Sequence, residues 1–196
     1  SEVSIVADKF ADSNLIAADL IAQAEHDVNA QSILITNNKN LIPLVNLSLK
    51  KQLAKLPKKN IASKSLKNFG LVIFANSKKK ILSAINTIAP EHLELFTKTN
   101  KEIIKGVKNA GSIFVGKFSP EAIGDYIAGP NHVLPTSGSA RFSSGLSVND
   151  FLKRHSLIKI TKTGIERLGS SVINLAEHEN LDGHANSVKM RLKKEH

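Results

Sequence analysis

The sequence contains no cysteine among its 196 residues, and aromatic residues make up only 5% of it. Without cysteine, the chain has no disulfide, no thiolate metal site and no cysteine nucleophile. No segment approaches the roughly 18 consecutive apolar residues of a membrane-spanning helix. The N-terminal sequence also lacks the basic start and the cleavage site of a secretory signal peptide. These absences favour a cytoplasmic protein with no membrane partner, and the length fits one domain or one domain with a small appendage.

Basic residues are abundant, and they give the chain a formal net charge of +10. They cluster at 50–59, 78–80, 98–108 and in the C-terminal KMRLKKEH. Clustered lysine is expected of a protein that binds phosphate groups. However, these lysines lie on predicted helix faces, and no aromatic side chains alternate with them to stack on bases. The sequence therefore favours a solvated lysine-rich surface and no nucleic-acid partner, with a nucleic-acid or anion-binding module as the alternative.

Short apolar runs alternate with helical patterns along most of the chain. The runs of strand length are SIVA (4–7), SILIT (32–36), LVIFA (71–75) and SIFVG (112–116). Helical patterns follow at 13–26, 40–56, 77–88 and 100–108, with Asp12 or Ser13 as the cap of the first and Ser77 as the cap of the third. This alternation predicts an α/β fold whose parallel sheet is covered by helices on both faces.

The pattern changes near Ser147. A helix is expected at 147–154, a strand, LIKIT, at 157–161, and helical sequence from there to the end. We therefore place an α/β domain at residues 1–146 and a small, mainly helical C-terminal domain at residues 147–196. No internal repeat is evident.

A long segment without helical or strand periodicity occupies residues 129–147. A loop of this length inside a compact domain is uncommon, and it is usually either functional or disordered. Four apolar residues and two prolines within the segment favour order. His132 at its centre and Asp125 just before it supply an imidazole and a carboxylate, which bind metals or transfer protons. From the loop alone, an ordinary surface loop is an equally good interpretation.

The first predicted helix is apolar nearly all round, yet Asp19, Gln23 and His26 form one polar stripe along it at i, i+4 and i+7. Polar groups on a buried helix cost free energy unless they are paired or bind a ligand. By spacing alone, a satisfied hydrogen-bond network is the better interpretation.

The segment GDYIAGPNHVLPTSGSARFSSGLSVNDFLKR (124–154) resembles the signature of histidinol dehydrogenases, the zinc enzymes that complete histidine biosynthesis. Three further blocks agree in order and spacing: SEVSIVAD…AADLIAQAEH (1–26), APEHLEL (89–95) and ENLDGHANSV (179–188). The resemblance covers the whole chain but only part of the longer family protein, so we interpret the chain as its C-terminal half. It implies a partial Rossmann-like layered sheet with flanking helices, and a homodimer with shared active sites.

The resemblance also implies a metal site. In the family, the positions that match Gln23, His26, Asp125 and His184 bind zinc, and two imidazoles with two oxygens are a plausible zinc ligand set. The zinc would hold the substrate, L-histidinol, and orient it for hydride transfer. The residues expected to bind substrate, directly or through the metal, are Ser1, Gln23, His26, His92, Asp125, Glu179 and His184. His132 is expected only to lie nearby.

The pair Glu91–His92 matches the acid/base groups of the family, although the bare sequence favours a surface location for both. Oxidation of an alcohol requires removal of the hydroxyl proton as hydride leaves, and an imidazole titrates near working pH. His92 would take that proton in both oxidations. Because this chain has no cysteine for a covalent intermediate, Glu91 would activate the water that adds to the aldehyde.

The implied reaction is a four-electron oxidation of L-histidinol to L-histidine through histidinal, with two NAD⁺ reduced. The chain has no G-x-G-x-x-G fingerprint, and the main NAD contacts of the family lie outside the matched region. The cofactor-binding residues are therefore unknown, and we expect the chain alone to be inactive. An inert truncated chain without catalysis is the remaining alternative.

Overall fold

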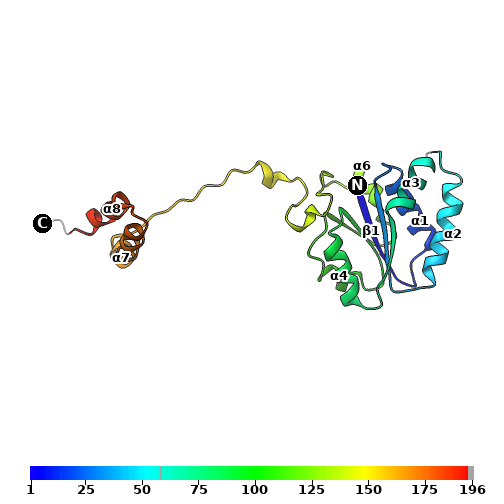
Figure 1. Ribbon diagram of the computed structural model, residues 1–196, viewed down its shortest axis with the longest axis horizontal. Helices are drawn as coiled ribbons and strands as arrows, with labels where there is room; N and C mark the ends of the chain where they lie inside the picture. Colours follow the sequence, from blue (N-terminus) through cyan, green and yellow to red (C-terminus); the bar gives the residue numbers. More distant parts are fainter. Residues whose placement is uncertain (58, 194–196) are drawn as a thin grey trace. The chain divides into compact units, whose positions relative to one another are not determined.

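The computed structural model describes residues 1–57 and 59–193, and the chain divides into two compact units, Ser1–Phe151 and Leu152–His196 (Figure 1). The short 3₁₀ helix Val148–Phe151 ends the first unit, so the division falls at Phe151, whereas the sequence pattern places it at residue 146.

The first unit is built on one five-stranded sheet. Its strands are β1 (Glu2–Ala7), β2 (Gln31–Thr36), β3 (Gly70–Phe74), β4 (His92–Phe96) and β5 (Ser112–Val115). They are ordered β3-β2-β1-β4-β5, and every neighbouring pair is parallel. This confirms the expected α/β fold with a parallel sheet.

The helices of the first unit are α1 (Ser13–Ala24), α2 (Leu41–Leu53), α3 (Lys59–Phe69), α4 (Lys78–Ile88), α5 (Asn100–Ile104) and α6 (Glu121–Tyr126). Two predicted caps are confirmed, because Asp12 accepts the Asn14 N–H at 2.8 Å and Ser77 accepts the Lys80 N–H at 3.3 Å. Each cap satisfies a backbone donor that the first turn of a helix leaves free.

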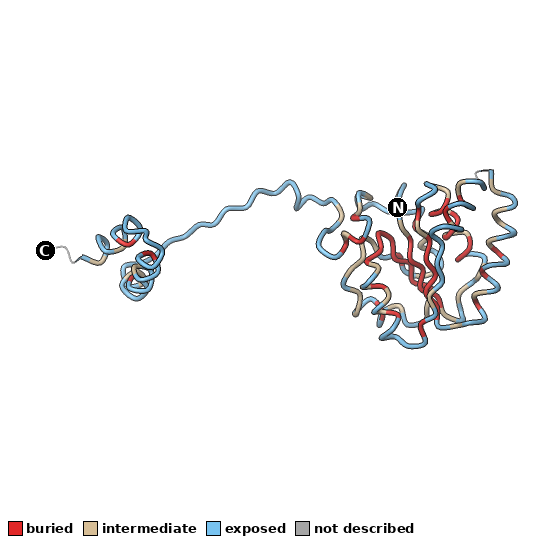
Figure 2. The backbone as a smooth tube through the Cα atoms, viewed as in Figure 1, coloured by how far each residue is buried: buried red, intermediate tan, exposed pale blue. Residues whose placement is uncertain are grey.

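Hydrophobic clusters fill both faces of the sheet. Successive side chains of a strand point to opposite faces, so Ile5 of β1 packs against α1 and α2 while its neighbour Val6 packs against α4 and α5. Figure 1 shows α4 on the other side of the sheet from α1 and α2, and Figure 2 shows the buried residues concentrated along the strands between them. The apolar runs of β1 and β2 are therefore covered on both faces, whereas the edge strands β3 and β5 leave most of their residues exposed or half-buried.

The secondary structure differs from the sequence-based prediction in several places. Neither α3 nor β4 is predicted by periodicity, and β4 carries two polar residues, His92 and Glu94, that are buried in the sheet. The expected helix at 147–154 is only the 3₁₀ helix at its centre. The predicted strand at 157–161 is wrong: this segment is neither strand nor helix, and Leu157 is 96% exposed. No strand occurs among the described residues of the second unit, so the segment has no partner in that unit for pairing.

The second unit is a helical hairpin of α7 (Lys162–His178) and α8 (Asp182–Leu192), joined by a turn in which Asn180 has a φ of 58°. Gly169 lets the helices approach closely, since a Cβ there would come within 2.8 Å of Leu192 and 3.2 Å of Val188. Of the helices that the structure describes in either unit, none has the length and apolar character needed to cross a membrane.

Candidate active site and metal centre

The candidate residues of the first unit gather at the edge of the sheet where its parallel strands begin. Helix α1 runs back from the carboxyl end of β1, so its last turn returns to this edge and brings Gln23 and His26 there. The register of the sheet pairs His92 with Val3, which places the start of β4 beside the start of β1. The chain start, the end of α1 and the start of β4 therefore meet.

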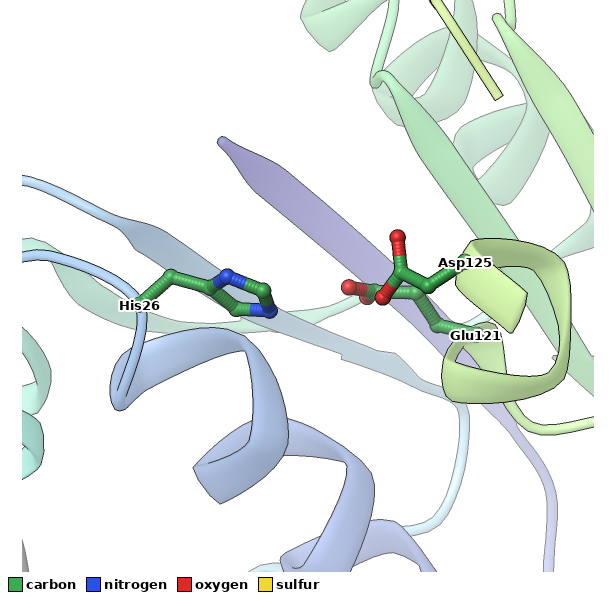
Figure 3. A group of neighbouring side chains, drawn as sticks. All are labelled: His26, Glu121 and Asp125. Atoms are coloured by element: carbon green, nitrogen blue, oxygen red, sulfur yellow. The ribbon is translucent and has the colours of Figure 1, made fainter. Parts of the chain in front are cut away.

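Three potential metal ligands lie together at this edge. His26, Glu121 and Asp125 each offer one ligand atom, and these atoms lie within 4.8 Å of one another. Figure 3 shows the His26 ring directed from the end of α1 toward the two carboxylates on α6. Glu121 and Asp125 are four residues apart in α6, so they share one helix face. Asp125 is thus helical, whereas the sequence pattern places it in a loop.

Glu121 is a site residue that the sequence analysis does not single out. Its spacing from Asp125 is the signal that could have revealed it, because i and i+4 are neighbours on a helix. Its side chain is nearly inaccessible, with 3% exposure. Burial, followed by the negative charges of Asp125, Glu91 and Asp19, raises the pKa of Glu121 to about 8. A bound cation would offset both causes.

Gln23 is fully buried at the centre of this cluster. In the amide orientation that satisfies its neighbours, its nitrogen donates to Glu121 Oε1 at 3.0 Å and Oε2 at 3.1 Å, and its oxygen accepts from Ser1 Oγ at 2.8 Å. The polar stripe on α1 therefore has partners within the protein as well as a place at the ligand cluster. Asp19, the first member of the stripe, faces the carboxyl group of Glu94.

His92 is almost completely buried, and both of its ring nitrogens have partners. Nδ1 lies 2.9 Å from the carbonyl oxygen of Glu2, and Nε2 lies 2.8 Å from His132 Nε2. Because a carbonyl only accepts, Nδ1 carries the hydrogen and Nε2 is left with a lone pair. Burial, followed by the charge of His132, lowers the pKa of His92 to about 4. The imidazole is therefore neutral at pH 7 and can accept a proton.

His132 connects His92 to the metal-type cluster. Its Nε2 atom also lies 3.1 Å from Asp125 Oδ1. The close approach of the ring depends on Gly124, because a Cβ at that position would come within 2.7 Å of His132 Cε1 and 2.8 Å of Phe114 Cζ. The long loop also closes on itself, with the Leu146 N–H donating to the Val133 carbonyl at 2.9 Å. The loop thus holds an imidazole against the start of β4.

Glu91 is 8% exposed and accepts the Glu2 N–H at 3.1 Å. Burial raises its pKa, and the positive N-terminal amine of Ser1 opposes that shift. A carboxylate with a raised pKa is a stronger base than an ordinary glutamate. Its neighbour in the sequence, His92, is 2% exposed, so neither residue has the surface location that the bare sequence favours.

Glu179 and His184 lie in the second unit. Glu179 follows the last residue of α7 as its C-cap, and His184 lies in the first turn of α8. Both side chains are exposed within that unit, so each is available to a ligand from outside it.

Imidazole nitrogen with carboxylate and amide oxygen is a donor set suited to zinc. The described residues fit this metal, because His26, Asp125 and the buried Gln23 amide converge where the negative charges of Asp125, Glu91 and Asp19 raise the pKa of the buried Glu121.

Comparison with known proteins agrees with this arrangement. The sequence model of the histidinol dehydrogenase family matches residues 1–192. The histidinol dehydrogenase of Pelagibacter ubique is 54% identical over 194 residues, which cover 99% of this chain and 45% of the relative. That of Caldanaerobacter subterraneus is 50% identical over 186 residues, which cover 95% and 43%.

A crystal structure of histidinol dehydrogenase from Elizabethkingia anophelis superposes with a TM-score of 0.91 at 40% identity and covers 98% of this chain and 44% of that one. The chain spans less than half the length of these relatives. The match extends over nearly every residue and includes the fold and all the blocks that carry the resemblance. The chain therefore belongs to the histidinol dehydrogenase family.

Proposed function

We propose that this chain supplies the zinc-binding and acid/base residues of an L-histidinol dehydrogenase, which oxidises L-histidinol to L-histidine through histidinal and reduces two NAD⁺. The observation that carries the proposal is the convergence of His26, Asp125 and Gln23 with the buried pair Glu91–His92 at one edge of the sheet. Family membership supports the dehydrogenase role. The buried base and the cluster of potential metal ligands support the roles proposed for these residues.

Gln23, His26 and Asp125 would hold zinc together with His184. When bound, the metal supplies a positive charge that fixes the nitrogens of the substrate and so orients its carbinol carbon. His184 and Glu179 belong to the second unit, which we propose is exchanged with a partner chain in a homodimer. Glu179 would then meet the cationic groups of the substrate, and Ser1 would contact the substrate beside Gln23.

His92 would act as the base in both oxidations. The substrate hydroxyl would replace His132 as the partner of His92 Nε2 and transfer its proton there as hydride passes from the carbinol carbon to NAD⁺. The products of this step are histidinal, NADH and a protonated His92. Asp125 stabilises the imidazolium that forms, because its negative charge raises the pKa of His92.

Glu91 would serve the second oxidation. It would take a proton from water as the water oxygen adds to the carbonyl carbon of histidinal, while the protonated His92 returns its proton to the carbonyl oxygen and becomes neutral again. The hydrated aldehyde then loses its hydroxyl proton to His92 and its hydride to a second NAD⁺, which leaves the carboxylic acid. The buried position of Glu91 supports this role, because burial raises the pKa of its carboxyl group.

Isothermal titration of the purified chain with Zn²⁺, and then of the zinc-loaded chain with L-histidinol, tests the proposal. We expect about one zinc per chain with zinc-dependent histidinol binding, and the loss of both in His26→Asn. His155→Asn, at an exposed histidine of the second unit, is the matched control. Absence of zinc binding in the unmodified chain would contradict the proposal, and salt-dependent DNA binding in its place would favour a nucleic-acid module.

A further inference from the structure

We infer that Glu121 is a positioning residue that orients the Gln23 amide and the His92 imidazole together. One buried carboxylate would thus couple the metal ligands to the base. The catalytic meaning of this inference rests on the proposed function. The positioning role itself is argued from the geometry of Glu121, Gln23 and His92. Neither the periodicity of the sequence nor its motifs assign Glu121 any role.

The first contact sets the polarity of Gln23. The two oxygens of Glu121 lie 3.0 and 3.1 Å from the amide nitrogen of Gln23, and the amide oxygen faces Ser1 Oγ at 2.8 Å. The two ends of a glutamine amide have nearly the same size, but only the oxygen can coordinate a cation. In its ionised form, which a bound cation favours, Glu121 can only accept hydrogen bonds, and behind the nitrogen it excludes the reversed orientation, which would present an NH₂ group to the metal. Glu121 therefore determines which atom of Gln23 is available.

The second contact concerns His92. Glu121 Oε2 lies 3.7 Å from His92 Nδ1, and both side chains are only 3% exposed. The Nδ1 hydrogen already points to the Glu2 carbonyl at 2.9 Å, so the carboxylate acts on the ring by proximity. When Glu121 is ionised, its negative charge, this close and away from water, favours the imidazole tautomer with hydrogen on Nδ1 and leaves the lone pair of Nε2 to accept a proton.

Glu121 is itself fixed in place from the sheet. Its backbone N–H donates to Oε1 of Glu94 at 2.7 Å, and Glu94 is fully buried on β4, two residues after His92. Helix α6 therefore begins at a point anchored to the strand that carries the base. The same helix presents Asp125 one turn later, so the anchor also places a potential metal ligand.

The proposal differs from direct metal coordination by Glu121, which its distance from His26 and Asp125 would also allow. Both oxygens of Glu121 already accept hydrogen bonds from the Gln23 nitrogen. We therefore assign Glu121 as a residue that orients the metal ligands without binding the metal itself. Substitution of a residue that orients metal ligands typically weakens metal binding by roughly 10- to 100-fold, whereas loss of a ligand has a larger effect.

The experiment uses the full 196-residue chain with Glu121→Gln, Glu121→Asp and the control Glu102→Gln, which removes an exposed carboxylate from α5 of the same unit. Zinc affinity is measured by competition with a chromogenic chelator. In the zinc-free protein, at a pH above the pKa of about 8 of Glu121 so that this group is ionised, ¹H–¹⁵N NMR follows the side-chain NH₂ signals of Gln23, identified by their loss in Gln23→Ala, and the ring nitrogens of His92. Thermal unfolding reports whether each variant is folded.

We expect Glu121→Gln to weaken zinc binding by roughly 10- to 100-fold and to shift the signals of both Gln23 and His92. Glu121→Asp should recover most of the affinity, and Glu102→Gln should match the unmodified chain. Unchanged Gln23 and His92 signals in a folded Glu121→Gln would overturn the proposal, as would a loss of zinc equal to that of His26→Asn, since that result makes Glu121 a ligand. The NMR signals require no metal, so a chain that binds no zinc would refute the proposed function and still test this inference.

Discussion

The Nε2 atoms of His92 and His132 lie 2.8 Å apart, and their rings stack with an angle of 15° between the planes. Two imidazoles can share this contact only if one of them donates and the other accepts. The Glu2 carbonyl fixes the hydrogen of His92 on Nδ1, so His132 is the donor. The pair therefore keeps His92 neutral and ready to accept a proton, while His132 remains only partly buried.

Replacing His132 should raise the pKa of His92. Its ordinary value of 6.5 falls to about 4, first through burial and then through the charge of His132. We expect His132→Ala to move the pKa of His92 upward, because the variant removes a like charge and admits water. NMR titration of the ring signals measures it, with His155→Ala as the control. A pKa that stays the same or falls would show that His132 does not suppress protonation of His92.

The metal-free chain should lose stability as the pH rises. In the folded protein, burial raises the pKa of Glu94 to about 9 and that of Glu121 to about 8, so both bind protons that the unfolded chain releases above its ordinary pKa of 4.5. Their stabilising effect is complete below pH 4.5 and is lost as the pH rises through 8 and 9. His92 acts in the opposite sense between pH 4 and 6.5, because its pKa is lowered.

Urea unfolding of the first-unit transition at pH 5.5 and at pH 8.5 measures this dependence. We expect lower stability at pH 8.5, and a smaller difference in Glu94→Gln, because glutamine imitates the protonated acid. Glu102→Gln should leave the difference unchanged. Equal stability at both pH values, or the same difference in Glu94→Gln, would contradict the assignment of protonated buried carboxyl groups.

In an assembled enzyme, Glu91→Gln should slow oxidation of histidinal more than oxidation of histidinol. Only the second oxidation adds water, whereas His92→Asn removes a base used in both. Losses of about 10²- to 10⁴-fold are typical when a general acid or base is removed. Separate assays with the alcohol and the aldehyde measure the two steps. Equal losses in both assays for Glu91→Gln would show that Glu91 is not specifically the water activator.

The chain alone should not oxidise histidinol. It carries no dinucleotide fingerprint and spans 45% of the length of its Pelagibacter ubique relative. Assays with L-histidinol, Zn²⁺ and NAD⁺ should show no NADH formation, and adding the N-terminal remainder of a full-length relative should restore some. A turnover rate of about 1 s⁻¹ or more from the chain alone would contradict this prediction.

The sequence predicts the sheet well where strands are apolar throughout. SILIT is buried on both faces, and LVIFA is an equally apolar run although it lies at the edge of the sheet and is largely exposed, so the apolar pattern identifies both as strands. β4 escapes prediction because His92 and Glu94 interrupt its apolar pattern, although the sheet buries both. The segment LIKIT (157–161) is the opposite case, because it is predicted as a strand and is not one. It has the composition of a strand but no neighbouring strand among the described residues of its unit.

The site is predictable only in part. The i, i+4, i+7 stripe on α1 reveals that Gln23 and His26 share a face. Spacing does not show whether these side chains bind a ligand or form hydrogen bonds within the protein. The structure gives Gln23 two internal partners, Glu121 and Ser1, that lie roughly 100 and 20 residues away in the sequence. Such contacts depend on how α1 and α6 meet at the sheet edge, which no local pattern contains.

Anomalous diffraction at the zinc absorption edge, from crystals of the chain grown with Zn²⁺, tests the central claim most directly. We predict the strongest peak between the end of α1 and helix α6, at about 2.0–2.2 Å from a His26 nitrogen and an Asp125 oxygen, with the Gln23 oxygen turned toward it. Peaks only at exposed histidines such as His155 or His178, with none beside His26, would contradict the assignment of this edge of the sheet as the metal and substrate site.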